Sequence, residues 1–68
     1  VMQIISNGER MLALTPTLTV EWFIGSHTAN VTGPRGDMDV FTFAFDKNTT
    51  QMLDFTSALQ NYLDYLEA

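Results

Sequence analysis

The chain has 68 residues, of which 46% are hydrophobic and 16% charged, and its formal net charge is −5. This length allows a single domain over residues 1–68, and the composition is typical of a folded chain. Because cysteine is absent, the chain can form neither a disulfide nor a cysteine-ligated metal site. With no membrane-length apolar run and no signal-peptide pattern, the sequence predicts a cytoplasmic protein.

The negative charge lies in the second half of the chain. Over residues 1–36 two glutamates balance two arginines, whereas residues 37–68 carry six carboxylates and a single lysine. Binding to a nucleic-acid backbone or to an anionic membrane surface depends on lysine and arginine. We therefore expect no direct nucleic-acid binding and no membrane binding.

The first predicted element is a β-hairpin over Met2–Leu14. Asn7 and Gly8, between two apolar runs, favour a two-residue type I′ turn that places Ile4 opposite Met11. Both faces of this hairpin are partly apolar, with Ile4, Met11 and Ala13 on one and Ile5, Leu12 and Leu14 on the other. The pattern leaves open which face meets the rest of the core. A hairpin that is apolar on both sides suggests that a partner or a second subunit covers one side, so a homodimer is expected.

Two further strands are predicted from alternating hydrophobicity. Leu18–Ile24 places Val20 and Trp22 on one face, with Phe23 as an apolar exception on the other. Met38–Phe45 places three phenylalanines on one face, which we expect to be core. The intervening residues 25–37 read either as a long functional loop or as a loop that contains a short edge strand over residues 29–32.

The last predicted element is a helix over residues 49–68. At helical spacing its apolar residues form one stripe, and Asn48 with Gln51 fits a capping box. The stripe consists of Met52, Phe55, Leu59, Tyr62, Leu63 and Leu66. The predicted fold is therefore α+β, a four-stranded antiparallel β-meander with one C-terminal helix packed on one face (ββββα).

No residue pattern supports catalysis. Ser26 and His27 are adjacent, so they point apart on an extended chain, and no nucleophile-elbow motif surrounds them. Asp37 and Asp39 are too few to hold a metal ion, and the glycines do not form a phosphate-binding loop. We predict that the protein is not an enzyme and uses neither a metal nor a cofactor.

Carboxylates form the candidate binding site. On the predicted helix Asp54, Asp64 and Glu67 face away from the core, and Asp37 and Asp39 begin the preceding strand. Acidic residues near a helix C-terminus oppose the macrodipole, and no lysine or arginine on this helix compensates them. They either keep a small protein soluble or meet a basic surface on a partner protein. The second interpretation predicts that these five residues bind the partner.

In size and charge the chain resembles the small acidic inhibitor proteins of phages, including anti-CRISPR and DNA-mimicking proteins. These proteins are short, lack cysteine and catalytic residues, and act by occupying a basic site on a partner. The resemblance implies a phage-type inhibitor that works inside a host cell. The alternative is a structural or adhesive subunit that uses the Gly25–Asp37 loop, because Arg35-Gly36-Asp37 is the integrin-recognition tripeptide.

Overall fold

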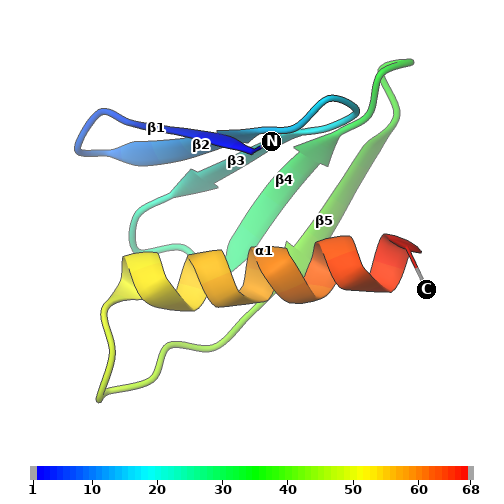
Figure 1. Ribbon diagram of the computed structural model, residues 1–68. Coiled ribbons are helices and arrows are strands. Elements are labelled where there is room, and N and C mark those ends of the chain that lie inside the picture. Colours follow the sequence, from blue (N-terminus) through cyan, green and yellow to red (C-terminus); the bar gives the residue numbers. More distant parts are fainter. Residues whose placement is uncertain (1, 68) are drawn as a thin grey trace.

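A computed structural model describes residues 2–67 as one antiparallel sheet with a C-terminal helix across one face (Figure 1). The strands are hydrogen-bonded in chain order, which confirms the predicted meander and its covering helix. The elements are β1 (Gln3–Ser6), β2 (Arg10–Leu14), β3 (Thr19–Phe23), β4 (Thr28–Thr32), β5 (Met38–Thr42) and α1 (Gln51–Glu67). The class is α+β, but the sheet has five strands, so the predicted number of four was wrong.

The additional strand is β4, in the segment that the sequence left open between loop and strand. It is not an edge strand, because it pairs with β3 on one side and with β5 on the other. Its side chains alternate, with Ala29 and Val31 buried and their neighbours exposed. Because the two buried residues are small and the other three polar, this strand has little hydrophobic signal in the sequence.

The β1–β2 hairpin forms with a register two residues away from the predicted one. Ile4 lies opposite Ala13, and the N–H of Asn7 donates to the carbonyl of Arg10 at 3.2 Å. The predicted type I′ turn needs a positive φ at Asn7, but in residues 2–67 only glycines have positive φ. Gly8, with φ of 89°, therefore takes the first central position, as in a type II′ turn. A shift of two preserves the faces, so Ile4 and Met11 still share one side.

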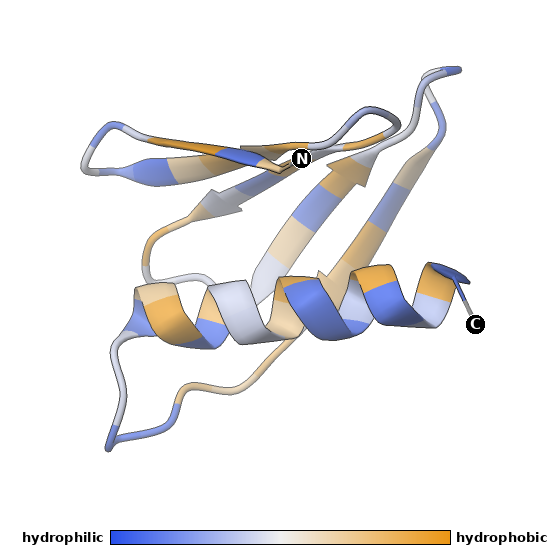
Figure 2. Ribbon diagram, in the orientation of Figure 1, coloured by the Kyte–Doolittle hydropathy of each residue, from blue (hydrophilic) through white to orange (hydrophobic). Residues whose placement is uncertain are grey.

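The core lies between α1 and the face of the sheet that we call the inner face. Hydrophobic and hydrophilic residues alternate along β4, as Figure 2 shows, and the hydrophobic ones, Ala29 and Val31, lie on the inner face. The fully or nearly fully buried hydrophobic residues are Met11, Ala13, Val20, Trp22, Ala29, Val31, Phe55 and Leu59. Trp22 of β3 and Phe55 of α1 stack with ring centroids 4.9 Å apart. The open question about the hairpin is thereby answered, since the face with Met11 and Ala13 meets the core.

The predicted phenylalanine stripe packs at the margin of the core. Phe41, Phe43 and Phe45 are partly buried and contact the core cluster, but none is fully buried. The N–H of Phe43 still bonds to the carbonyl of His27 at 2.9 Å, although β5 ends at Thr42. Phe41 belongs to the edge strand β5 and the other two rings follow it, so no further strand of the described chain covers their outer side.

The helix begins at Gln51, and Thr50 is its N-cap in place of the predicted Asn48. The Thr50 hydroxyl accepts a hydrogen bond from the N–H of Leu53 at 3.2 Å. Asn48 lies in the preceding turn, where its N–H bonds to the Asp46 carboxylate. The predicted stripe is correct at its centre, where Phe55 and Leu59 are fully buried. At its ends Met52 and Leu66 are 43% and 49% exposed, because α1 extends beyond the core.

Candidate functional site

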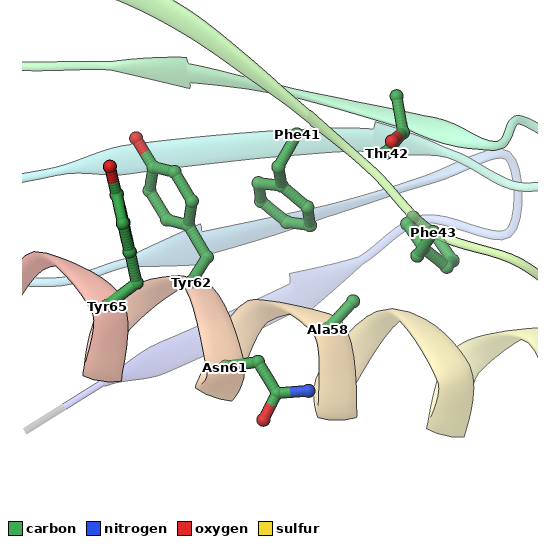
Figure 3. A pocket seen from close by; sticks show the side chains of 7 residues that line it. All are labelled: Phe41, Thr42, Phe43, Ala58, Asn61, Tyr62 and Tyr65. Atoms are coloured by element: carbon green, nitrogen blue, oxygen red, sulfur yellow. The ribbon is translucent and has the colours of Figure 1, made fainter.

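An aromatic groove lies between the free edge of β5 and the helix. It has a volume of about 400 Å³, and Figure 3 shows the side chains that line it. These are Phe41, Thr42 and Phe43 from β5 and the residues after it, with Ala58, Asn61, Tyr62 and Tyr65 from α1. The helix contributes residues at spacings of three and four, which lie on one side of it. This side faces the space where a sixth strand would lie, so the groove is open along the sheet edge.

The rings of the groove continue the packing of the core. Phe41 stacks on Tyr62 with ring centroids 5.0 Å apart, and it also stacks on the buried Phe55 at 6.5 Å. Tyr65 is 74% exposed, although an aromatic ring gains much from burial. The base of the groove is therefore held in place by the core through Phe41, and Tyr65 is an exposed aromatic ring at its margin.

The orientation of Tyr62 is fixed by a contact between the helix and β5. Its hydroxyl donates a hydrogen bond of 2.8 Å to Asp39 Oδ2. The other carboxylate oxygen, Oδ1, accepts the N–H of Val40, also at 2.8 Å. These two bonds, that of Tyr62 first, hold the pKa of Asp39 below its usual range. The pKa of Tyr62 is raised, because partial burial disfavours the phenolate and because Asp39 bonds to its neutral form.

A second hollow of about 200 Å³ begins on the other side of Tyr62. It lies between the C-terminal half of α1 and the hairpin that joins β4 to β5. Asp37 and Asp39 both line it, together with Tyr62 and Leu66 of the helix. The two hollows share the Tyr62 ring, so an aromatic surface and two carboxylates are adjacent.

The five predicted carboxylates are not one cluster. Asp37 and Asp39 lie together at the second hollow. Asp64 is exposed on α1 and accepts a hydrogen bond from Gln60 at 3.0 Å. Glu67 lines a separate hollow on the β2–β3 loop side of the helix, with Leu63. Asp54 lies about 15 Å from Asp64 along the helix axis, since ten residues separate them at 1.5 Å each.

Asp54 has a structural contact of its own. Its Oδ2 accepts the N–H of Asp46 at 2.9 Å, and its Oδ1 accepts the hydroxyl of Thr49 at 2.5 Å. It also lies in the first turn of α1, where a negative charge interacts favourably with the helix dipole. These contacts fix the segment before the helix. They give Asp54 a structural role that does not depend on a binding partner.

The residues considered for catalysis are engaged in local contacts. The Ser26 hydroxyl lies 3.1 Å from that of Thr28, and the His27 ring packs on Phe45 with centroids 4.2 Å apart. Within residues 2–67 no group of three or more His, Asp or Glu side chains is arranged to hold a metal ion. In the same part of the chain, no helix is both long enough and apolar enough to cross a membrane.

The Arg35-Gly36-Asp37 string forms the tip of the β4–β5 hairpin. The N–H of Gly36 bonds to the carbonyl of Gly33, and the N–H of Gly33 bonds to the carbonyl of Asp37. Gly36 has a φ of 83°, as expected when a type I turn is followed by a left-handed residue in a three-residue hairpin loop. The turn therefore explains the glycine through local geometry alone.

The aromatic lining is the part of the site that sequence reasoning missed. The helical pattern places Tyr62 in the core stripe and predicts no role for Tyr65. The available signal was the spacing of Ala58, Asn61 and Tyr65, which forms a second stripe next to the core stripe. Comparisons of the chain with protein-family models, curated proteins and solved structures found no match. The function is therefore inferred from the residues and geometry of the site.

Proposed function

We propose that this protein is a non-enzymatic binding module that holds a basic segment of a partner protein against the groove between β5 and α1. The observation that carries the proposal is the adjacency, around Tyr62, of carboxylates and of partly buried aromatic rings with the exposed Tyr65 beside them. A lysine or arginine over an aromatic face is attracted by the ring, and the attraction grows when nearby water is displaced. Carboxylates beside the ring attract the same cationic side chain by Coulomb interaction.

The charge of the whole chain supports the same partner. With a net charge of −5, the protein attracts a basic surface over a distance of about one Debye length, which is roughly 8 Å at physiological salt. Such a field speeds association and fixes orientation more than it adds affinity. The resemblance to small acidic phage inhibitors is consistent with this mode of binding, and the inhibitor role stays a prediction.

The free edge of β5 favours recognition through side chains. In this strand the residues that bond to β4 alternate with those that face the open edge, and Val40 is at the centre of the second set. Its N–H is already bonded to the Asp39 carboxylate. A partner strand would have to displace that bond before it could pair there. We therefore expect side chains inserted between Phe41 and Tyr65 to hold the partner.

The alternative from the sequence, adhesion through Arg35-Gly36-Asp37, has one supporting observation. The tripeptide lies at an exposed hairpin tip. Because the turn itself requires Gly36, the string needs no binding role to explain it. The groove is the better-supported site, since neither the core nor a turn requires an exposed Tyr65.

The proposal is tested with a short synthetic peptide of alternating arginine and leucine, titrated into the protein and followed by NMR. We expect shifts at Tyr62 and Tyr65 and binding that weakens as salt rises. Asp64→Lys should weaken binding at least threefold, because it reverses an exposed charge on the helix. Glu9→Lys is the matched control, since it makes the same change in the β1–β2 turn. Equal affinities of the two variants, or binding that ignores salt, would contradict the proposed site.

A further inference from the structure

The face of the sheet opposite α1, called here the outer face, is covered by nothing in the described chain. Cross-strand pairing identifies its members, because directly opposed residues share a face. Its apolar residues are Ile5, Leu12, Leu14, Phe23, Met38 and Val40. We propose that this face binds a second copy of the chain, so that two sheets pack face to face. The proposal goes beyond partner binding at the groove and uses the other side of the molecule.

Burial is strongly unequal between the two faces. On the inner face Val20 and Trp22 are fully buried, whereas on the outer face Phe23 is 49% and Val40 53% exposed. The accessible surface is 4699 Å², compared with roughly 4,300 Å² expected for a folded monomer of this mass. The isolated chain thus exposes more surface than its size requires, and the excess is consistent with an uncovered face.

Charge identifies the occupant of the outer face. Among the described strand residues that lie on the outer face, the only ionisable ones are Arg10 and Glu21, which form an ion pair with each other. The outer face therefore has no net charge, and the whole net charge of −5 lies elsewhere on the molecule. A basic partner is attracted to the helix side and gains nothing from this face. A second copy, which is equally acidic, meets the least repulsion here.

The sequence of the outer face also suits sheet-on-sheet packing. Ile5 of β1 lies opposite Leu12 of β2, and Leu14 lies further along β2 on the same face, so an apolar patch covers these first two strands. Two such faces pack about 10 Å apart with their strands nearly aligned. In a two-fold arrangement the same patch serves both copies, which requires no second, complementary surface.

The size of the face sets the strength of the dimer. Five strands about 4.8 Å apart and about 16 Å long make a footprint of roughly 300–400 Å² per copy. A standard stable interface buries about 800 Å² per partner. We therefore expect a weak dimer that dissociates in the micromolar range. An edge-to-edge dimer through β5 is less favoured, because the Asp39 carboxylate already occupies the N–H of Val40.

Sedimentation equilibrium over a range from low to high micromolar protein tests the proposal. The wild type should pass from the mass of one chain to that of two. Higher salt should tighten the dimer, because it screens the repulsion between two acidic copies, whereas it should weaken binding of the basic peptide. Phe23→Glu and Ile5→Glu should each weaken the dimer at least tenfold, because each adds an unpaired charge to the contact. Circular dichroism melting of both variants checks that the monomer remains folded.

Tyr65→Glu is the matched control on the helix side. It introduces the same charge at an exposed aromatic position, so dimerisation should be unchanged while binding of the arginine–leucine peptide changes. The two proposals can therefore fail separately. A wild type that stays monomeric throughout the range would overturn the dimer. So would a dimer that survives in both folded outer-face variants, which would indicate pairing through a sheet edge.

Discussion

The two faces of the sheet are formed by alternate residues of the same strands, but only the inner face is covered by the helix. On the inner face the alternate residues of β3 and β4 are buried under α1, with Val20 and Ala29 fully excluded from solvent. On the outer face of the same strands lie Glu21, Asn30 and several threonines, with apolar residues toward both edges. The difference shows that one helix can complete a core for only one side of a five-stranded sheet.

The faces also differ in charge, so each face favours a different kind of binding partner. The outer face has only the Arg10–Glu21 ion pair, whereas the helix side has uncompensated carboxylates near Tyr62. A neutral apolar face favours association with an equally charged copy, and an acidic aromatic groove favours a basic partner. Variants on each side can therefore be compared directly, beginning with the one that should have the largest effect.

Leu59→Asp should abolish cooperative unfolding, because Leu59 is fully buried between α1 and the inner face. A buried carboxylate without a partner costs at least several kcal/mol, and a domain of this size has little stability to lose. Thermal melting followed by circular dichroism measures the outcome. Leu53→Asp is the control on the same helix, since Leu53 is 58% exposed, and its melting temperature should stay near that of the wild type. A cooperative melt of the Leu59 variant at the wild-type temperature would show that the helix is packed differently.

Asp54→Ala should cost about 1–2 kcal/mol of unfolding free energy, because it removes a first-turn carboxylate that binds a backbone N–H and a hydroxyl. Urea denaturation measures the change. Asp64→Ala removes an exposed carboxylate bonded only to Gln60, so it should stay within about 0.5 kcal/mol of the wild type. Equal losses in the two variants would indicate that Asp54 does not hold the segment before the helix. Binding of the basic peptide should show the reverse order, with the larger loss at Asp64.

Much of the fold could be predicted from the sequence, where the hydrophobic pattern was strong. The alternation around Trp22 and the helical stripe through Phe55 identified the two elements that form the core. The β4 strand was left open, because Ala29 and Val31 add little hydrophobicity between polar residues. The predicted β1–β2 register was wrong. It assumed a turn centred on Asn7 and Gly8, whereas the observed turn is centred on Gly8 and Glu9 and needs a positive φ at Gly8 alone.

The candidate site was less predictable, because it depends on how the helix crosses the sheet. The helical pattern placed Asp54, Asp64 and Glu67 on the side away from the core, but it could not reveal that Asp54 bonds to the N–H of Asp46. The contact between Asp39 and Tyr62 joins residues 23 positions apart, and no local pattern predicts it. The groove appears only once the edge strand and the helix are placed side by side.

The Asp39–Tyr62 contact gives the smallest predicted effect, a dependence of stability on pH. The folded state lowers the pKa of Asp39, so the contact stabilises the protein above the unfolded pKa of about 3.9 and is lost as the pH falls below it. The pKa of Tyr62 is raised in the folded state. Its contribution is therefore complete below the unfolded pKa of about 10 and is lost as the pH rises through the folded value.

Tyr62→Phe keeps the ring that lines the groove, removes the ionisation of Tyr62, and removes the larger of the two hydrogen bonds that lower the pKa of Asp39. We expect the variant to be less stable than the wild type between about pH 5 and 9, and the gap to close toward pH 3 and toward pH 11. Urea denaturation at a series of pH values measures the gap. Tyr65→Phe is the control, because the exposed Tyr65 makes no such contact with Asp39, and its pH profile should follow that of the wild type. A constant gap between Tyr62→Phe and the wild type at every pH would mean that the hydroxyl acts through packing alone, and that Asp39 is free to meet a partner.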